Sequence, residues 1–525
     1  MPRSIQRARS WRSAFTEALV LMLASCAFGT GCAEVPCGPR LRCEPPAEEE
    51  LPDKEPPCPD EPQGGLVATD ECGVFVSSSL GHDRNPGTSK APVKTIGRAI
   101  ELLAQEPQRP PRVHACSENF PEAVRVRGTL EIWGGFDCHL EWIHDGGGRN
   151  TVIEPEPDET PLTFEADATA TVFDLEARAA SATAPGGSSI AAIMLEGARV
   201  TLHRGALVAG DGARGRDGAP GDPKNAPGRA GRHGRFGEDA CTGDFVLGGD
   251  QAHTACEQAD SIGGRGGDGT VDHGAPGGDG ELMPIPNLTG FGLGGRGATS
   301  TDDCLAGQTG ANGPDGAHGL GARGLGAFSS RGHYLGVNGG DGGDGGPGQG
   351  GGGGGGTRAG AMFCGTARNA GGAGGGSGGS GGCGGRGGHG GGHGGASVGL
   401  VILNARVELH GTGVTAARGG DGGHGGVFQI GGAPGLGAPG GQGFGGSPFG
   451  CSGGDGGKGG NGGHGGGGQG GPSIAVAVVG PSLPVVMEAE LTAGTGGKGG
   501  LGANPSVAGS AGDDGLAIAV AGFPQ

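Results

Sequence analysis

The segment Gly187-Ser188-Ser189-Ile190-Ala191-Ala192-Ile193 opens a short repeat that decides the fold. It is followed by VTL at 200–202, and the unit ends at Ala209. In this copy and in two later ones, a serine precedes the closing alanine by 20 residues. Two short apolar runs per unit are typical of one coil of a solenoid, because a single coil cannot bury its own apolar face and must stack on neighbours. The later copies are ASVGLV (396–401) with VEL (407–409), ending at Ala417, and PSIAVA (472–477), ending at Ala493.

Shorter apolar runs fill the region that precedes the repeat. Strands are expected near 151–153, 162–164 and 171–175, separated by Gly, Pro and Asp. One early helix is expected, because Ile96, Ile100 and Leu103 fall at helical spacing. Short strands at close spacing with a single helix predict a repetitive all-β fold.

Four motifs of this region resemble the opening of right-handed parallel β-helix proteins of the pectin-lyase-like superfold. They are VFVS (74–77), NPGT (85–88), PVKTIGRAI (92–100) and WGGFD (133–137). The resemblance covers roughly residues 72–209. It implies a parallel β-helix in which the helix caps the open end of the coil stack and the later strands form the first rungs. It implies no particular activity, since that superfold includes lyases, hydrolases and adhesins.

Glycine supplies 133 of the 525 residues and is concentrated in tracts between the repeat units. In the tract that contains Ser377, Ser380 and Cys383, each such residue is followed by a Gly-Gly pair, and a second tract follows the same rule around Asp455 and Lys458. A Gly-Gly-X period of three matches a left-handed three-residue helix, whose hydrogen bonds must be made laterally. We therefore expect bundled polyglycine-II-like helices, and a disordered low-complexity loop is the open alternative.

The tracts also resemble, in composition, the PE-PGRS class of glycine-rich surface proteins. The helical Pro-Glu domain that defines that class is absent from this sequence. The resemblance therefore carries no functional residue over to this chain.

The first residues are typical of a secretory signal, with four arginines before residue 13 and an apolar run at 18–28. LASC (23–26) and GTGC (29–32) both resemble a lipoprotein processing site. We favour lipidation at Cys32, with Cys26 as the alternative, because Cys32 leaves a longer apolar run and an even number of cysteines. An ordinary cleaved signal followed by a soluble secreted chain is the other open interpretation.

An acidic, proline-rich stalk is expected after the signal. Cys37, Cys43 and Cys58 are candidates for local staples within it. The expected organisation is a signal peptide (1–31), stalk (32–67), N-terminal β-helix (68–209), glycine-rich insertion (210–395), rung (396–417), second insertion (418–471) and C-terminal rungs (472–525).

The net charge of −19 excludes a typical nucleic-acid binder, which needs a basic face. An exported chain meets an oxidising compartment, so its cysteines are interpreted as disulfides rather than as metal ligands. Cys116 and Cys138 are 22 residues apart, close to one coil, and are predicted to bond across adjacent rungs. The expected location is the outer membrane or cell surface as a lipoprotein, or else the periplasm or medium.

The sequence contains partial matches to two kinds of chemical site. Asp302-Asp303 and Gly388-His389-Gly390 match parts of a polygalacturonase pattern, but the chain contains no Arg-x-Lys to complete it. His389 and His393 could wrap a metal ion, yet histidine also simply fills the X position of the tract. The sequence therefore predicts no catalytic residue, metal or cofactor. It favours a non-catalytic envelope scaffold or adhesin-like protein, held by a lipid and contacting glycans or neighbouring copies. A β-helix lyase or hydrolase of acidic glycans is the alternative.

Overall fold

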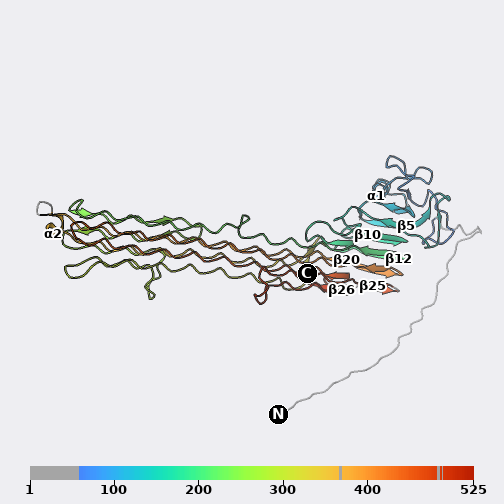
Figure 1. The fold of residues 1–525 in the computed structure, drawn as a ribbon. Helices are drawn as coiled ribbons and strands as arrows, with labels where there is room; N and C mark the ends of the chain where they lie inside the picture. Colours follow the sequence, from blue (N-terminus) through green and yellow to red (C-terminus); the bar gives the residue numbers. More distant parts are fainter. Residues whose placement is uncertain (1–57, 366–368, 482–484, 488, 525) are drawn as a thin grey trace, which may run out of the picture. The chain divides into compact units, whose positions relative to one another are not determined.

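The computed structural model describes residues 58–365, 369–481, 485–487 and 489–524 (Figure 1). The predicted signal peptide, Cys26, Cys32 and most of the predicted stalk lie outside the described residues. Three sheets of parallel strands dominate the described part. The all-β class and the parallel sheets predicted from the sequence are confirmed.

The first sheet has seven strands in parallel register, with β6 (Ile143–His144) added antiparallel to β5. Its strands, in spatial order, are β1 (Val74–Val76), β2 (Arg112–Cys116), β5 (Thr129–Asp137), β9 (Thr169–Phe173), β12 (Arg199–His203), β21 (Arg406–His410) and β24 (Val485–Met487).

The second and third sheets have six parallel strands each. The second sheet consists of β3 (Asn119–Phe120), β7 (Thr151–Ile153), β10 (Leu175–Ala179), β13 (Ala206–Ala209), β22 (Gly413–Thr415) and β25 (Glu490–Thr492). The third consists of β4 (Val124–Val126), β8 (Leu162–Phe164), β11 (Ser189–Met194), β20 (Ser397–Leu403), β23 (Ser473–Val479) and β26 (Ala517–Phe523).

From β7 onward, successive members of these three sheets enter the second, third and first sheets in a fixed cycle. This cycle gives a solenoid-like stack. Register explains the sequence repeat, because Ile190 pairs with Val398 and Val398 with Ile474. Copies of the repeat therefore lie one above another and bury apolar residues in two clusters, one that contains Ala192, Leu400 and Val476 and a second that contains Ile190, Val398 and Ile474.

Tight corners join the first sheet to the second. Asp174 is the single residue between β9 and β10, and its φ is 51°. Arg204 (φ 52°) and Gly411 (φ 59°) take the same left-handed conformation at the equivalent corners of the next two coils. Residues other than glycine rarely adopt this φ. At Asp174, hydrogen bonds to the side chain help to hold the corner in place. Asp174 is fully buried and accepts hydrogen bonds from His144 and Arg204.

The helix α1 (Ile96–Gln105) packs against β1, β2 and β4 at the N-terminal end of the stack. Thr95 caps it by accepting a hydrogen bond from the amide of Arg98, and Ile96 and Leu103 are buried. The helix lies where the sequence placed it.

Close to this end, the last residues of the predicted stalk contact the folded part. Leu66 packs against the core. Cys58 is bonded to Cys72, so the prediction that Cys58 staples the stalk locally is wrong. The sequence does not reveal this contact, because a proline-rich stretch has the composition of an extended stalk whether or not it packs against a folded domain.

The glycine-rich insertions leave the stack at the corner between the second and third sheets. The largest runs from β13 to β20, the next from β22 to β23 and the last from β25 to β26. Within them lie the small hairpins β14 (Phe245–Val246) with β17 (Gly269–Thr270), β15 (His253–Thr254) with β16 (Ser261–Ile262), and β18 (Ala327–Phe328) with β19 (Tyr334–Leu335), and the short helix α2 (Ala361–Cys364).

Extended glycine segments run side by side in a bundle (Figure 1). The central segment, 370–395, bonds to several others. Its lateral bonds include Gly382 N to Gly457 O (3.0 Å), Cys383 N to Arg229 O (2.9 Å), Gly432 N to Cys383 O (2.8 Å), Gly348 N to Gly382 O (2.8 Å) and Gly378 N to Gly264 O (2.8 Å). These are the lateral bonds that a polyglycine-II arrangement requires.

Close approach explains why these positions are glycine. A Cβ atom on Gly382 would overlap the carbonyl oxygen of Gly432, and one on Gly381 would overlap that of Gly348. Only a chain without side chains at two of three positions packs on several sides at once.

Candidate functional site

Parallel neighbours in the glycine bundle share a two-point contact. The Asn312 side chain accepts a hydrogen bond from the amide of Lys458 (2.9 Å), while the amide of Gly313 donates to the Lys458 carbonyl (2.8 Å). We call this contact an amide latch. The same contact joins Asp315 to Asn461 and His318 to His464, and it recurs between other segments at Asp211–Arg418, Asp217–His424, His233–Leu436, Asp421–Lys498 and His424–Leu501.

Side chains also cap amides where a neighbouring segment ends. On segment 370–395, the amide of Gly378 donates to a backbone carbonyl, that of Gly264. Farther along the same row, Gly387 donates to Asp344 (2.8 Å) and Gly390 donates to Asp341 (2.7 Å). Short acceptors at X positions thus satisfy edge amides that would otherwise be unpaired. Their first role is structural.

The two histidines considered for metal binding face different partners. His389 Nδ1 lies 3.5 Å from Asp341 Oδ2, whereas His393 Nδ1 lies 3.1 Å from the carbonyl oxygen of Gly394. Among the described residues, no group of three or more His, Cys, Asp or Glu side chains is arranged to hold a metal ion.

The polygalacturonase-like residues also lie apart. Asp302 accepts from Thr299 in an exposed turn, and Gly388-His389-Gly390 belongs to segment 370–395. Neither group lines the cleft described below.

Cys116 and Cys138 are disulfide-bonded in the structure, with a Cα–Cα distance of 5.7 Å. Cys116 ends β2, and Cys138 follows β5, its neighbour in the first sheet. Within the described part of the chain, four other disulfides join Cys58–Cys72, Cys241–Cys364, Cys256–Cys383 and Cys304–Cys451. Five disulfides indicate an oxidising, extracellular or periplasmic environment.

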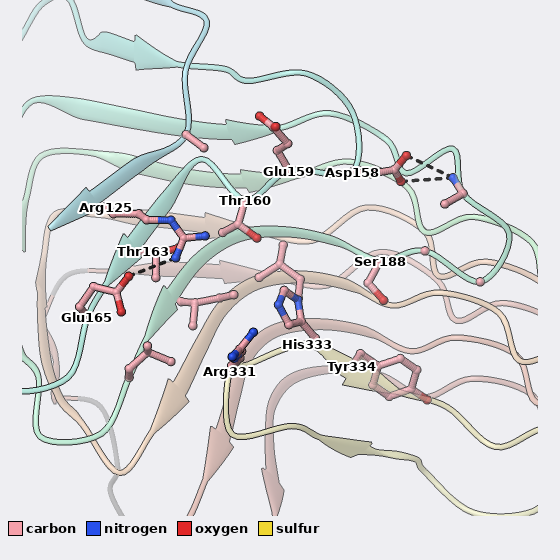
Figure 2. A pocket seen from close by; sticks show the side chains of 17 residues that line it. Arg125, Asp158, Glu159, Thr160, Thr163, Glu165, Ser188, Arg331, His333 and Tyr334 are labelled. Atoms are coloured by element: carbon pink, nitrogen blue, oxygen red, sulfur yellow. Dashed lines mark hydrogen bonds and ion pairs between the residues drawn. The ribbon is translucent and has the colours of Figure 1, made fainter. Parts of the chain in front are cut away.

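A cleft of about 720 Å³ lies where the outer face of the third sheet meets the hairpin β18–β19 (Figure 2). Strands β4, β8 and β11 supply its floor, including the buried Ile190 and Ile193. The hairpin covers the later strands, and Tyr334 joins their apolar cluster. The cleft therefore lies beside the edge of the hairpin, over the strands that the hairpin leaves uncovered.

Charged groups line both sides of the cleft (Figure 2). Arg125 and Glu165 form an ion pair at 3.1 Å. Asp158 accepts from the amide (2.9 Å) and hydroxyl (2.5 Å) of Thr183. These hydrogen bonds lower the pKa of Asp158, so it is ionised at neutral pH and is unsuited to act as a general acid.

The hairpin adds Arg331, His333 and Tyr334 to the cleft. Within the described residues, neither Arg331 nor His333 forms an ion pair. The Tyr334 hydroxyl donates to the carbonyl of Leu325 (3.1 Å), and burial raises the pKa of this phenol. Tyr334 therefore acts as a packed, neutral group.

The cleft has no counterpart among the features predicted from the sequence. Its walls come from segments far apart in the chain, and the hairpin belongs to a glycine-rich insertion. One signal was present, since the only tyrosine of the chain, Tyr334, lies in a short stretch with few glycines (327–335).

The fold and site define an all-β protein of stacked parallel sheets with a hydrogen-bonded glycine bundle. Comparison of the chain with family models, with curated proteins and with solved structures found no match in any of the three. Within the described ranges, no helix has the length and apolar character needed to cross a membrane.

Proposed function

We propose that this protein is a non-catalytic scaffold of a bacterial cell envelope. In this proposal, a right-handed parallel β-helix carries the glycine bundle, and a lipid on Cys32, or alternatively on Cys26, holds the chain at the membrane. The single observation that supports a scaffold best is the amide latch, because the polar residues of the bundle serve its own backbone.

The cleft supports the same proposal. A glycosidase needs two carboxyl groups free to act on one bond. Here Glu165 is paired with Arg125, and Asp158 is held ionised by Thr183. Of the three carboxylates that line the cleft, only that of Glu159 forms no hydrogen bond or ion pair with another described residue. One free carboxylate does not make a catalytic pair.

Location and anchoring are tested together in cells. The full chain is labelled with a radioactive fatty acid in the parent and in Cys32→Ala and Cys26→Ala variants. The expected result is label in the parent and in Cys26→Ala and loss of label in Cys32→Ala. Digestion of intact cells with an external protease then reports surface display. Unlabelled protein in the culture medium would contradict the anchor.

The alternative function is a lyase or hydrolase of acidic glycans, favoured by one observation. Arg331 and His333 face the cleft without acidic partners and would attract a carboxylated sugar. Incubation of the full chain with a polysaccharide panel, with and without calcium, separates the two functions. We expect no new reducing or unsaturated ends, and their release would establish an enzyme instead.

A further inference from the structure

The end of the glycine bundle that carries α2 gathers several chain turns (Figure 1). Two disulfides, Cys241–Cys364 and Cys304–Cys451, join these turns in pairs. We call this end the tip and define it by residues 236–250, 270–274, 298–305, 357–365 and 443–451.

The tip exposes large apolar side chains, although aromatic residues make up only 4% of the whole chain. Met362 is 86% exposed, Phe449 62%, Phe444 60% and Phe245 57%. Phe236, Leu247 and Leu305 add to the same end. Exposed apolar side chains that gather in one place mark an interaction surface, because scattered ones would be tolerated without function.

The chain turns that carry these side chains are joined to one another by hydrogen bonds. The Thr357 hydroxyl donates to the carbonyl of Pro448 (3.4 Å), and Arg358 donates to the carbonyl of Ser300 (2.9 Å). The hairpin β14–β17 holds Phe245 opposite Thr270. A surface held in this way loses little conformational entropy on binding, which favours affinity.

Charge distinguishes the partners that fit this surface. Among the described residues of the tip, acidic side chains outnumber arginines, even when Arg235 and Arg296, which lie just outside its ranges, are included. Asp244, Asp272 and Asp303 form no ion pair within the described part of the chain. The acids are Glu238, Asp239, Asp244, Asp250, Asp272, Asp302 and Asp303, and the arginines are Arg235, Arg296 and Arg358.

We propose that the tip docks onto a protein surface that combines an apolar patch with a rim of lysine and arginine side chains. Phenylalanine and methionine would fill the patch, and the acids would pair with the basic rim. A second copy of the tip is disfavoured, because like charges would face each other. This inference deepens the proposed scaffold role and rests on it.

The test uses immobilised amphipathic helical peptides as probes. One peptide has leucine on one face and lysine on the other, a second replaces lysine by glutamate, and a third replaces it by serine. Surface plasmon resonance of the full chain should show binding to the leucine–lysine peptide that weakens with salt, and much weaker binding to the other two. Equal binding to all three peptides, or preferential binding to phosphatidylcholine vesicles, would overturn the proposal.

Variants locate the binding surface. The combined change Phe245→Ser, Phe444→Ser and Phe449→Ser should lower affinity for the leucine–lysine peptide by about tenfold or more. Asp244→Asn with Asp303→Asn should reduce the dependence on salt. The matched control is Ile285→Ser with Leu288→Ser, two exposed apolar residues in a loop outside the tip, which should leave affinity unchanged.

The controls also keep the two proposals apart. Melting temperatures of all variants should agree with the parent, since every changed side chain is exposed. An equal loss of binding in the Ile285 and Leu288 control would remove the assignment to the tip. Failure of surface display with intact peptide binding would overturn the scaffold proposal alone, whereas display without peptide binding would overturn only the tip.

Discussion

The hydroxyl of Ser397 accepts a hydrogen bond from the amide of Ala417 (2.8 Å) and donates one to the carbonyl of Gly210 (2.7 Å). Ser189 and Ser473 make the equivalent pairs one coil to either side, with Gly210 and Ala180, and with Gly494 and Ala417. Each serine thus closes its own coil and bonds to the preceding one. The amide that donates to the serine lies 20 residues later in the chain for Ser397 and 21 residues later for Ser189 and Ser473, so the serine-to-alanine spacing in the sequence marks the end of a coil.

Ser397→Ala is expected to destabilise the stack. Ser397 is fully buried, and the change leaves the partly buried amide of Ala417 and carbonyl of Gly210 without this partner, at a cost of about 1 kcal/mol. Urea denaturation of the full chain measures the change in the free energy of unfolding. Ser452→Ala, at an exposed serine of the bundle, is the control and should change little.

Gly382→Ala is expected to disrupt the bundle, because the new Cβ overlaps the Gly432 carbonyl. Overpacking at such a site costs on the order of 1–3 kcal/mol, and hydrogen exchange of segments 370–395 and 418–443 should accelerate. Gly522→Ala is the control, since no atom lies within 4 Å of its Cβ position. Equal exchange in both variants would contradict the close packing of the glycine segments.

The amide latch is tested by Asp315→Ala and Asp315→Asn. Alanine removes the acceptor for the Asn461 amide, whereas asparagine keeps an oxygen at the same place. Faster hydrogen exchange at Asn461 is expected for alanine, corresponding to roughly 1 kcal/mol of local stability, with recovery in the asparagine variant. The same rate in all three proteins would show that the latch contributes nothing.

His114 is expected to make stability depend on pH. Burial, assisted by the charge of Arg112, lowers the pKa of His114 to about 3. The unfolded chain, with a histidine pKa near 6.5, binds the proton more readily than the folded chain does. Burial of the neutral His114 side chain therefore leaves stability at its full value above about pH 6.5, and stability is lost as the pH falls from there towards 3. Urea denaturation at pH 7.5, 5.5 and 4.5 should give a smaller decrease in His114→Phe than in the parent. His389→Gln, at an exposed histidine, should behave like the parent.

Peptide mapping without reduction tests the covalent connections. The expected linked pairs include Cys58–Cys72 and Cys116–Cys138. Recovery of Cys116 or Cys138 as a free thiol from the exported protein would contradict the second pair. Loss of Cys256–Cys383 by a double change to serine should cost about 2–5 kcal/mol, because this bond closes a long loop.

Periodicity made much of the fold predictable. The serine-to-alanine spacing located β11, β20 and β23, and helical spacing located α1. Strands β7 and β8 begin and end at the expected residues. These elements were accessible because each has a local pattern that its buried face imposes.

Which glycine segments lie side by side was not predictable in the same way. Every Gly-Gly-X tract has the same local pattern, so the sequence does not show that Asn312 belongs with Lys458 or Asp315 with Asn461. The cleft depends on bringing Arg331 to the strand that carries Arg125, which is again a long-range event. Cys58 was misassigned for the same reason.

All three insertions leave the stack at one corner, between the second and third sheets, and their segments follow a common period of three. Insertion or deletion of three residues in one tract alone would shift that tract by one repeat relative to its neighbours, and its amide latches would no longer face their present partners. Lengthening all tracts together by one triplet would instead preserve each contact and extend the bundle by about 9 Å. Evolution of this protein could therefore alter the reach of the bundle in discrete steps while the β-stack that supports it stays unchanged.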